Sequence, residues 1–370
     1  MIFATDCIKT SRRGQNPVPI DYFAMHAIEM SHKEVTIYDI ARALNLSPAT
    51  ISRGLKDHPG LRQETRERIQ KAAREMGYRH NAFASNLRRK RTNTIGVMIP
   101  RLNSYFMATV IAGIEKVANA AGYNLIISQS EESYKKEMSG VTTMFNSRVD
   151  GLLVSLAYNT ENLDHFEALL KKEIPIVFFD RVIDHPACTS IVIDNRRAGY
   201  EVTRHLLEQG CTRIVHLVGN LNRNVYADRL DGYRQALSEF GIAYDEPLVV
   251  QGDLTEQAGK EATEKMLAMN PRPDGVFASN DTTAVAVIRT LKQAGLRVPH
   301  DVAVAGFNND PLASVIEPGL TTVNYPGDII GEVAAQTLMK KLDGAQQETS
   351  NVITIEHNLI IRQSTLRTNH

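Results

Sequence analysis

Two short helices around a tight turn are predicted by the stretch Thr36-Ile-Tyr-Asp-Ile-Ala-Arg-Ala-Leu-Asn-Leu-Ser-Pro-Ala-Thr-Ile-Ser-Arg53. Thr36 is a good N-cap and Asp39 approximates a capping box, so the first helix starts there. Ser47 caps the second helix, and Pro48 suits its first position, where no amide hydrogen is needed. Two helices of this length bury little core, but the second fits the major groove of DNA.

A third helix is predicted from about Gln63 to Met76, with Gly77 as its stop. Gly54 lies inside the second helix and costs roughly 1 kcal/mol relative to alanine, so packing must hold that helix in place. A generic three-helix bundle is the alternative interpretation. The outward face of the second helix is short and polar and carries Arg53, which favours a DNA-binding domain.

The charges of the chain are divided between its two ends. Residues 31–91 contain 14 Lys and Arg against 6 Asp and Glu, whereas residues 92–370 contain 25 against 33. The zero net charge is therefore the sum of two unequal parts: a basic head (residues 31–91) with a charge of +8 and an acidic body (residues 92–370) with a charge of −8. A basic head attracts phosphates and an acidic body does not.

A second informative segment follows the third helix. It contains Asn81-Ala-Phe-Ala-Ser-Asn-Leu87, then a basic run ending at Arg91, and it leads into the apolar strand Thr94-Ile-Gly-Val-Met-Ile-Pro100. Together with the Thr36-Ile-Tyr-Asp-Ile-Ala and Ser47-Pro-Ala-Thr-Ile-Ser-Arg motifs, this segment resembles the LacI/GalR family of bacterial transcription regulators. The resemblance runs from about Val35 to Ile361.

The resemblance assigns roles to the side chains of the head. Arg53 has the fork geometry to grip a guanine, and Ala49 is small enough to meet a thymine methyl. Phosphate contacts set the register without reading sequence. The base-reading positions implied are Pro48, Ala49 and Arg53, and the phosphate-holding positions are Thr36, Tyr38, Thr50 and Ser52.

The resemblance also implies a hinge over residues 81–92. In the family this segment, Asn81 to Arg88 here, coils into a helix when two protomers meet on an operator. Leu87 of each protomer then wedges into the minor groove and kinks the duplex, and Arg88 lies near the backbone. The alternative is a flexible basic linker, which we expect off DNA because the segment is too short to be helical alone.

Apolar strands alternate with amphipathic helices through the body, as they do in βαβ units. Continuous apolar strands indicate that both faces of a parallel sheet are covered, and two series of strands imply two similar lobes. The residues alone therefore predict a doubly wound α/β sheet. The candidate strands are 95–99, 124–128, 151–154, 176–179, 191–193, 214–218, 248–251, 275–278, 302–306 and 353–357.

The resemblance completes the fold class: an N-terminal all-α helix-turn-helix domain plus an α/β two-lobed type I periplasmic-binding-protein-like body. We expect an extension over 1–32, either disordered or an upstream misassigned start before Met30. The helix-turn-helix domain then covers 33–80 and the effector-binding and dimerisation domain 94–361. Within that domain, the expected N-lobe is about 94–192 plus 325–342, and the expected C-lobe is about 193–322 plus 345–361.

Ligands bind such sheets at the carboxyl ends of the strands, here in the cleft between the lobes. Of the neighbouring aromatic residues Tyr105 and Phe106, we expect one to pack in its helix. Asp180 and Arg181 could instead form an ion pair across the lobes, and Asp281 could merely cap a helix. Arg229, in a motif matching the family's Arg-x-x-Gly-aromatic signature, is the strongest candidate, because arginine forks suit carboxylates and paired hydroxyls. The candidate ligand-binding residues are Tyr105, Phe106, Asp180, Arg223, Arg229, Asn280 and Asn308.

Asn308 departs from the family pattern, which commonly has an aspartate at this position. An amide both donates and accepts hydrogen bonds, so this position can recognise different groups. By resemblance the ligand is a sugar or sugar derivative, with nucleobase or phosphorylated effectors left open. The ligand either loosens DNA binding (induction) or tightens it (corepression), and the sequence does not choose between them.

Several other functions are excluded by the residues. The isolated Cys7, Cys188 and Cys211 indicate neither a zinc site nor a disulfide scaffold, and they fit a reducing cytoplasm. No apolar run is long enough to span a membrane, and the first thirty residues lack the apolar core of a signal peptide. No nucleophile elbow, P-loop or catalytic carboxylate pair is present, so we expect neither an enzyme nor a cofactor.

A soluble solute-binding protein and an enzyme with a sugar-binding cleft are the rival interpretations. Neither explains residues 36–92, so the sequence predicts a cytoplasmic, nucleoid-associated transcription regulator, most simply a repressor. Its partners are expected to be a pseudo-palindromic operator and a small effector. Because no leucine heptads follow Ile361-Arg-Gln-Ser-Thr365, we expect a homodimer.

Overall fold

The computed structural model describes residues 35–78, 91–344 and 351–367. Residues 1–82 and 83–370 form two separate compact units. The expected N-terminal extension and most of the expected hinge lie outside the described residues. The hinge predictions for Asn81, Leu87 and Arg88 fall in that part.

The first unit contains the three predicted helices, α2 (Ile37–Leu44), α3 (Pro48–Leu55) and α4 (Gln63–Glu75). The predicted capping box is present: the Thr36 amide donates to Asp39 Oδ2 at 2.9 Å. Ser47 caps α3, its hydroxyl accepting from the Thr50 amide at 3.1 Å. The core of this unit consists of Ile40, Ala41, Ile51, Ile69 and Ala73.

Gly54 explains how the short core holds α3 against α4. A Cβ atom at this position would lie 2.5 Å from Ile69 Cδ1, closer than atoms can approach. The absence of a side chain therefore lets α3 pack directly on Ile69. The conformational cost of glycine in a helix is offset by this contact.

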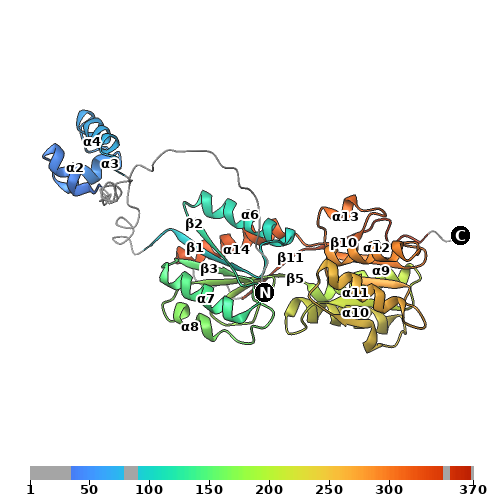
Figure 1. The fold of residues 1–370 in the computed structure, drawn as a ribbon. Helices are drawn as coiled ribbons and strands as arrows, with labels where there is room; N and C mark the ends of the chain where they lie inside the picture. Colours follow the sequence, from blue (N-terminus) through green and yellow to red (C-terminus); the bar gives the residue numbers. More distant parts are fainter. Residues whose placement is uncertain (1–34, 79–90, 345–350, 368–370) are drawn as a thin grey trace, which may run out of the picture. The chain divides into compact units, whose positions relative to one another are not determined.

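The second unit has two lobes, each built on a six-stranded sheet (Figure 1). The N-lobe sheet has the order β11-β5-β4-β3-β1-β2 and is parallel throughout. Its strands are β1 (Thr94–Ile99), β2 (Asn124–Gln129), β3 (Gly151–Val154), β4 (Ile176–Phe179), β5 (Thr189–Ile193) and β11 (Val352–Ile355).

The C-lobe sheet has the order β12-β10-β9-β8-β6-β7, and only the pairing of β10 with β12 is antiparallel. A doubly wound architecture was predicted for both lobes and is confirmed. The C-lobe strands are β6 (Ile214–Val218), β7 (Val249–Gln251), β8 (Gly275–Ala278), β9 (Ala303–Asn308), β10 (Thr321–Asn324) and β12 (Asn358–Ile360).

Helices cover both faces of each sheet, which is why the strands are apolar on both sides. In the N-lobe, α6 (Tyr105–Ala120) and α14 (Gly327–Leu342) lie together on one face, with α7 (Tyr134–Asn146) and α8 (Glu167–Leu170) on the other (Figure 1). None of the helices in the described part combines the length and apolar character that a membrane span needs.

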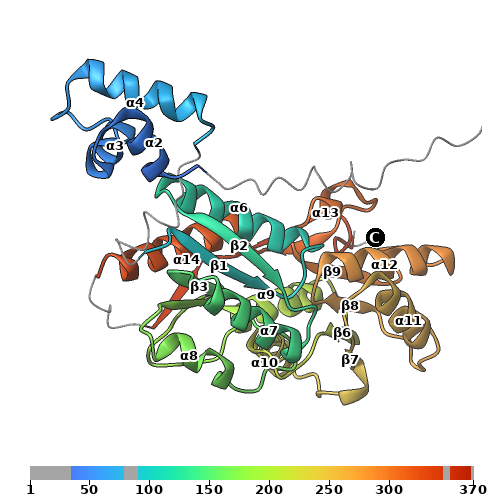
Figure 2. The same ribbon diagram turned by 60° about the vertical axis from the view of Figure 1, so that its left-hand side comes forward.

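The C-lobe follows the same plan. Its helix pairs are α9 (Asn195–Glu208) with α10 (Asn224–Glu239), and α11 (Glu256–Leu267) with α12 (Asp281–Gln293), one pair on each face (Figure 2). A short helix, α13 (Leu312–Val315), follows β9. Three-residue 3₁₀ turns precede α8 at 164–166 and β7 at 246–248.

The chain crosses between the lobes three times, after β5, after β10 and between β11 and β12. The expected assignment of 345–361 to the C-lobe is therefore wrong for β11. That strand pairs in parallel with β5 of the N-lobe, Val352 lying opposite Ser190 and Ile355 opposite Ile193. Only two residues separate β11 from β12. The sequence therefore predicted a single strand there, although β11 and β12 belong to different sheets.

Candidate functional site

The outward face of α3 is the candidate DNA interface of the first unit. Ala49 and Arg53 are exposed, whereas Pro48, Thr50 and Ser52 are half-buried. No ion pair holds Arg53 within the described residues, so its guanidinium is available to a ligand. A short helix with a free arginine on an exposed polar face suits base-edge readout in a major groove.

The other two predicted phosphate contacts differ in their availability. Tyr38 is 60% exposed and extends from α2. The Thr36 hydroxyl donates to Asp39 Oδ2 at 2.7 Å, and the Thr36 amide uses the same oxygen. Thr36 therefore serves the helix cap first, and a phosphate would have to share or displace that bond.

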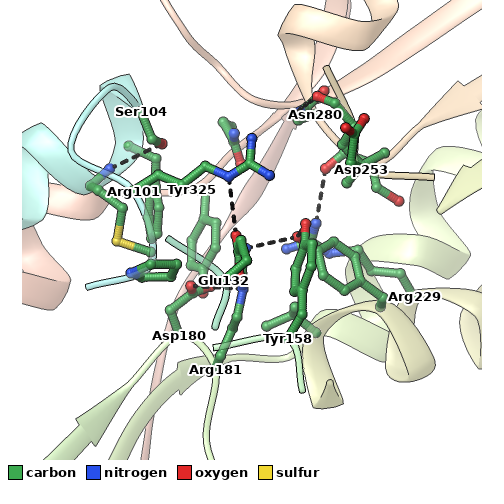
Figure 3. Close-up of a pocket in the computed structure, with 18 residues that line it drawn as sticks. Arg101, Ser104, Glu132, Tyr158, Asp180, Arg181, Arg229, Asp253, Asn280 and Tyr325 are labelled. Atoms are coloured by element: carbon green, nitrogen blue, oxygen red, sulfur yellow. Dashed lines mark hydrogen bonds and ion pairs between the residues drawn. The ribbon is translucent and has the colours of Figure 1, made fainter. Parts of the chain in front are cut away.

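The second unit contains a cleft between its lobes, with an empty space of about 630 Å³ including its open mouth (Figure 3). It lies at the carboxyl ends of the strands, as predicted for doubly wound sheets. The side chains that line it come from both lobes. They are Pro100, Arg101, Ser104, Phe106, Met107, Glu132, Tyr158, Asp180, Arg181, Val225, Tyr226, Arg229, Asp253, Leu254, Ser279, Asn280, Asn308 and Tyr325.

Arg229 is the most constrained charged group of the cleft. It is 3% exposed, and burial lowers the pKa of its guanidinium. Nε donates to Asn195 Oδ1 at 2.9 Å and Nη1 to the Ser279 carbonyl at 3.1 Å, and the guanidinium lies 3.5 Å from the Phe307 ring centroid. No carboxylate of the described residues forms an ion pair with it. Buried cations without such a partner are costly, which makes Arg229 a candidate for binding a polar or anionic ligand.

The Arg-x-x-Gly-aromatic signature has a structural explanation in α10. Gly232 allows close contact with α9, because a Cβ there would lie 2.0 Å from the Arg196 carbonyl oxygen. Tyr233 is fully buried and its hydroxyl donates to the Ile214 carbonyl at 2.8 Å. Glycine and tyrosine fix the helix on the sheet, and the same helix then places Arg229 in the cleft.

A network of charged and aromatic groups lines the N-lobe wall of the cleft (Figure 3). Asp180 accepts from Ser155 Oγ at 3.1 Å and from the Tyr325 hydroxyl at 2.9 Å. Arg181 donates to Glu132 at 2.7 Å and lies over the Tyr158 ring, 4.3 Å from its centroid. Asp180 and Arg181 approach each other at 3.9 Å within the same lobe, so the interlobe ion pair considered from the sequence is not formed.

The N-terminal turn of α10 joins the two lobes. Asn224 exchanges hydrogen bonds with the backbone of Asp180 and Val182 at 3.1 and 3.0 Å. The Tyr226 hydroxyl accepts from Arg181 at 3.1 Å and lies 3.2 Å from the Tyr158 hydroxyl. The first turn of α10 therefore supplies contacts between the lobes.

The predicted ligand residues separate into two groups. Phe106, Asp180, Arg229, Asn280 and Asn308 line the cleft. Phe106 stacks on Tyr325 with centroids 4.2 Å apart. Tyr105 is 51% exposed and does not line the cleft. Arg223 does not line it either, because its guanidinium is buried and donates to the Thr160 carbonyl of the other lobe.

The helix cap expected of Asp281 is supplied by Asn280. The Asn280 Oδ1 accepts from the Thr283 amide and its Nδ2 donates to the Leu254 carbonyl, each at 2.9 Å. Asp281 is fully buried and accepts from the Asp310 amide and the Thr322 hydroxyl. Asn280 lines the cleft, and each end of its amide already has one protein partner.

Several residues that line the cleft were not among the ligand-binding residues predicted from the sequence. Arg101 and Glu132 follow β1 and β2, so the strand-end rule could have found them. Tyr226 precedes Arg229 by three residues and shares its helix face. Tyr325 lies at the second crossing between lobes, and its contact with Asp180, 145 residues away, gives no local signal.

With both sites described, the chain can be compared with known proteins. The family described as "Bacterial regulatory proteins, lacI family" matches residues 36–81, and a periplasmic-binding-protein-like domain matches residues 203–365. Catabolite control protein A of Priestia megaterium is 34% identical over 332 residues, which cover 90% of this chain and 99% of that protein. This chain belongs to the LacI family.

The other similarities agree with this assignment. The transcriptional repressor PurR of Vibrio atlanticus is 30% identical over 90% of this chain and 99% of that protein. The structure of the Lac repressor dimer bound to operator and an anti-inducer matches with a TM-score of 0.78 at 25% identity. The structure of the regulator CelR with cellobiose matches with a TM-score of 0.67 at 28% identity. Both structural matches cover 90% of this chain and all of the other chain.

Membership in the LacI family establishes the general function. The relatives are DNA-binding transcription regulators and not enzymes, and a helix-turn-helix head joined to a periplasmic-binding-like body is their common plan. This chain is a DNA-binding transcription regulator of that family. A solute-binding protein without DNA-binding function would not carry the matched head.

Proposed function

We propose that two copies of this chain bind a pseudo-palindromic operator and that a small ligand in the interlobe cleft controls their affinity for the operator. The observation that supports this most strongly is Arg229, held in the cleft by Asn195 and Ser279 without a carboxylate partner among the described residues. The Lac repressor that shares this fold is a dimer bound to operator. Two identical heads related by a two-fold axis require two half-sites of matching symmetry.

On the operator, α3 enters the major groove. Arg53, Ala49 and Pro48 read base edges, while Tyr38, Thr50, Ser52 and Thr36 hold phosphates. The exposure of Arg53, Ala49 and Tyr38 supports these roles. In the hinge, which includes Asn81, Leu87 then wedges into the minor groove between the half-sites and Arg88 lies near the DNA backbone.

The ligand is a sugar or sugar derivative. CelR, a structural neighbour, is seen with cellobiose, and the Lac repressor is seen with the anti-inducer ONPF. Phe106 offers a wall for a sugar ring, and Arg229 and Asn308 offer polar groups from the opposite lobe. Because the protein must reach DNA, it acts in the cytoplasm at the nucleoid.

Ligand binding is coupled to DNA binding through the relative position of the lobes. A ligand contacting both lobes favours one lobe arrangement, and the coupling free energy acts on ligand and DNA affinity equally. A thermal-shift screen of sugars, sugar acids and nucleobases would identify ligands, and each hit would be tested for its effect on operator affinity. Hits that leave operator affinity unchanged would contradict the proposed coupling.

A further inference from the structure

The hydrogen-bonding groups of the cleft are unevenly used, and this bears on the ligand's chemistry. Two of its three carboxylates already have a protein donor on each oxygen. Asp180 accepts from Ser155 and Tyr325. Glu132 receives Arg181 on one oxygen at 2.7 Å and Arg101 on the other at 3.4 Å. Only Asp253 retains an unused oxygen, since its bonds to Thr255 involve Oδ1 alone.

Donors, in contrast, remain available on both sides of the cleft. Arg101 extends from the N-lobe into the middle of the cleft (Figure 3), and its only ion pair with a described residue is the contact of Nε with Glu132. Within the described residues, Nη1 and Nη2 of Arg101 and Nη2 of Arg229 form no hydrogen bond. The Ser279 hydroxyl is buried and also lacks a partner there.

The charges of the cleft are paired unevenly. Its three guanidiniums face three carboxylates, but Arg181 contacts both Glu132 and Asp180, Arg101 shares Glu132, and Arg229 has no ion pair among the described residues. A neutral sugar supplies hydroxyl oxygens to the free N–H groups but gives neither Arg101 nor Arg229 an anionic partner of its own. A ligand anion supplies acceptors and charge together, and charge-assisted hydrogen bonds are about twice as strong as neutral ones.

We propose that the effector is an anionic sugar derivative, its carboxylate or phosphate held between Arg101 of the N-lobe and Arg229 of the C-lobe. The hydroxyl groups of its carbon chain bind to Asp253, Ser279 and Asn308. Contact with one arginine from each lobe makes the anion the group that draws the lobes together. This inference rests on the proposed function, since it names the ligand class of the same cleft.

The test uses the full chain and calorimetric titration with matched pairs of probes. D-Glucuronate and D-galacturonate are compared with glucose and galactose, and gluconate and glucose 6-phosphate separate carboxylate from phosphate recognition. We expect at least one anionic probe to bind about tenfold or more tightly than its neutral counterpart. Tighter binding of the neutral sugars, or no binding of any anionic probe at millimolar concentration, would overturn the inference.

Variants connect the preference to the two arginines. Arg101→Gln should reduce the affinity for the anionic probe about tenfold or more and reduce the preference over the neutral sugar, whereas Arg204→Gln, on an exposed face of α9, should change neither. An unchanged anion preference in Arg101→Gln would also overturn the inference. Operator affinity measured with the same probes separates the two proposals: an anion that binds without altering it contradicts the proposed coupling, and a neutral sugar that alters it contradicts only the ligand class.

Discussion

The guanidinium of Arg229 lies 3.5 Å from the centroid of the Phe307 ring. Phe307 is fully buried at the end of β9, one residue before Asn308, so the ring that supports the arginine also fixes the position of a neighbouring cleft residue. The guanidinium stacks on an aromatic face and donates two hydrogen bonds to protein, and within the described residues its Nη2 forms no hydrogen bond. The side chain is held in place before the ligand arrives, which lowers the entropic cost of binding.

Arg229→Lys should therefore abolish the ligand response. A lysine ammonium is a point charge and cannot hold Asn195 and Ser279 while also presenting a donor to the cleft. We expect the ligand affinity to fall by about tenfold or more, with operator binding unchanged in the absence of ligand. Calorimetry and fluorescence anisotropy measure the two quantities, and Arg204→Lys is the matched control. A preserved ligand response would mean that the binding site lies elsewhere.

Arg53→Ala should weaken operator binding by about 1–3 kcal/mol and relax the preference at one base position in each half-site. The measurement is a titration of operator duplexes with single base-pair changes. Arg42→Ala, on an exposed part of α2, provides the comparison for general loss of positive charge. If Arg53→Ala weakens operator and random duplex equally, Arg53 contacts phosphate only.

Gly54→Ala should destabilise the head although alanine is the better helix former. The new Cβ would overlap Ile69 Cδ1, and overpacking typically costs about 1–3 kcal/mol, more than the roughly 1 kcal/mol gained in helix propensity. Ile69→Val removes the clashing atom, so the double variant should recover part of the loss. Thermal unfolding of the head measures both effects. Additive destabilisation in the double variant would show that the contact is not the cause.

The stability of the C-lobe should decrease as the pH rises. Burial raises the pKa of Asp281 to about 8 and that of Asp310 to about 6. Both exceed the usual value of about 4, so the native state retains protons that the unfolded chain releases. The destabilisation is absent below pH 4 and develops between about pH 4 and 8.

Asp310→Asn isolates this effect, because one oxygen of the Asp310 carboxyl has no partner in the described residues. The variant should lose less stability than the parent protein between about pH 4 and 6, the interval between the unfolded and folded pKa values of Asp310, as measured by urea denaturation. An equal or steeper loss in the variant would rule out Asp310 as a source of the pH dependence.

Local patterns in the sequence predicted most of the fold. The Thr36 and Asp39 capping box, the Ser47 cap and the alternation of apolar strands each depend on residues close in the chain, and each is confirmed. The third crossing between lobes was missed, because β11 and β12 are short and close together and their partners lie far away in the sequence. Pairing partners of edge strands are decided by tertiary packing and not by local propensity.

Part of the cleft was also predictable from local patterns in the sequence. Strand ends and a sequence signature pointed to Arg229, Asp180 and Asn308. Asn280 and not Asp281 caps the helix, because the choice between capping and burial depends on Thr322 and Asp310, which lie at least 29 residues away from Asp281. Sequence spacing places side chains near a strand end, but it does not determine which of them are already satisfied by the protein.

The central claim is that a ligand in the body controls a sequence-specific DNA-binding head. Its most direct test is selection of duplexes from a random library by the full protein, followed by anisotropy titration of the enriched duplex with and without the strongest-binding sugar acid. We predict enriched sequences with two symmetric half-sites, bound about 10³-fold or more tightly than a scrambled duplex, and a change in that affinity of about fivefold or more with ligand. Equal affinity for enriched and scrambled duplexes at moderate ionic strength, with ligand and without it, would contradict the account.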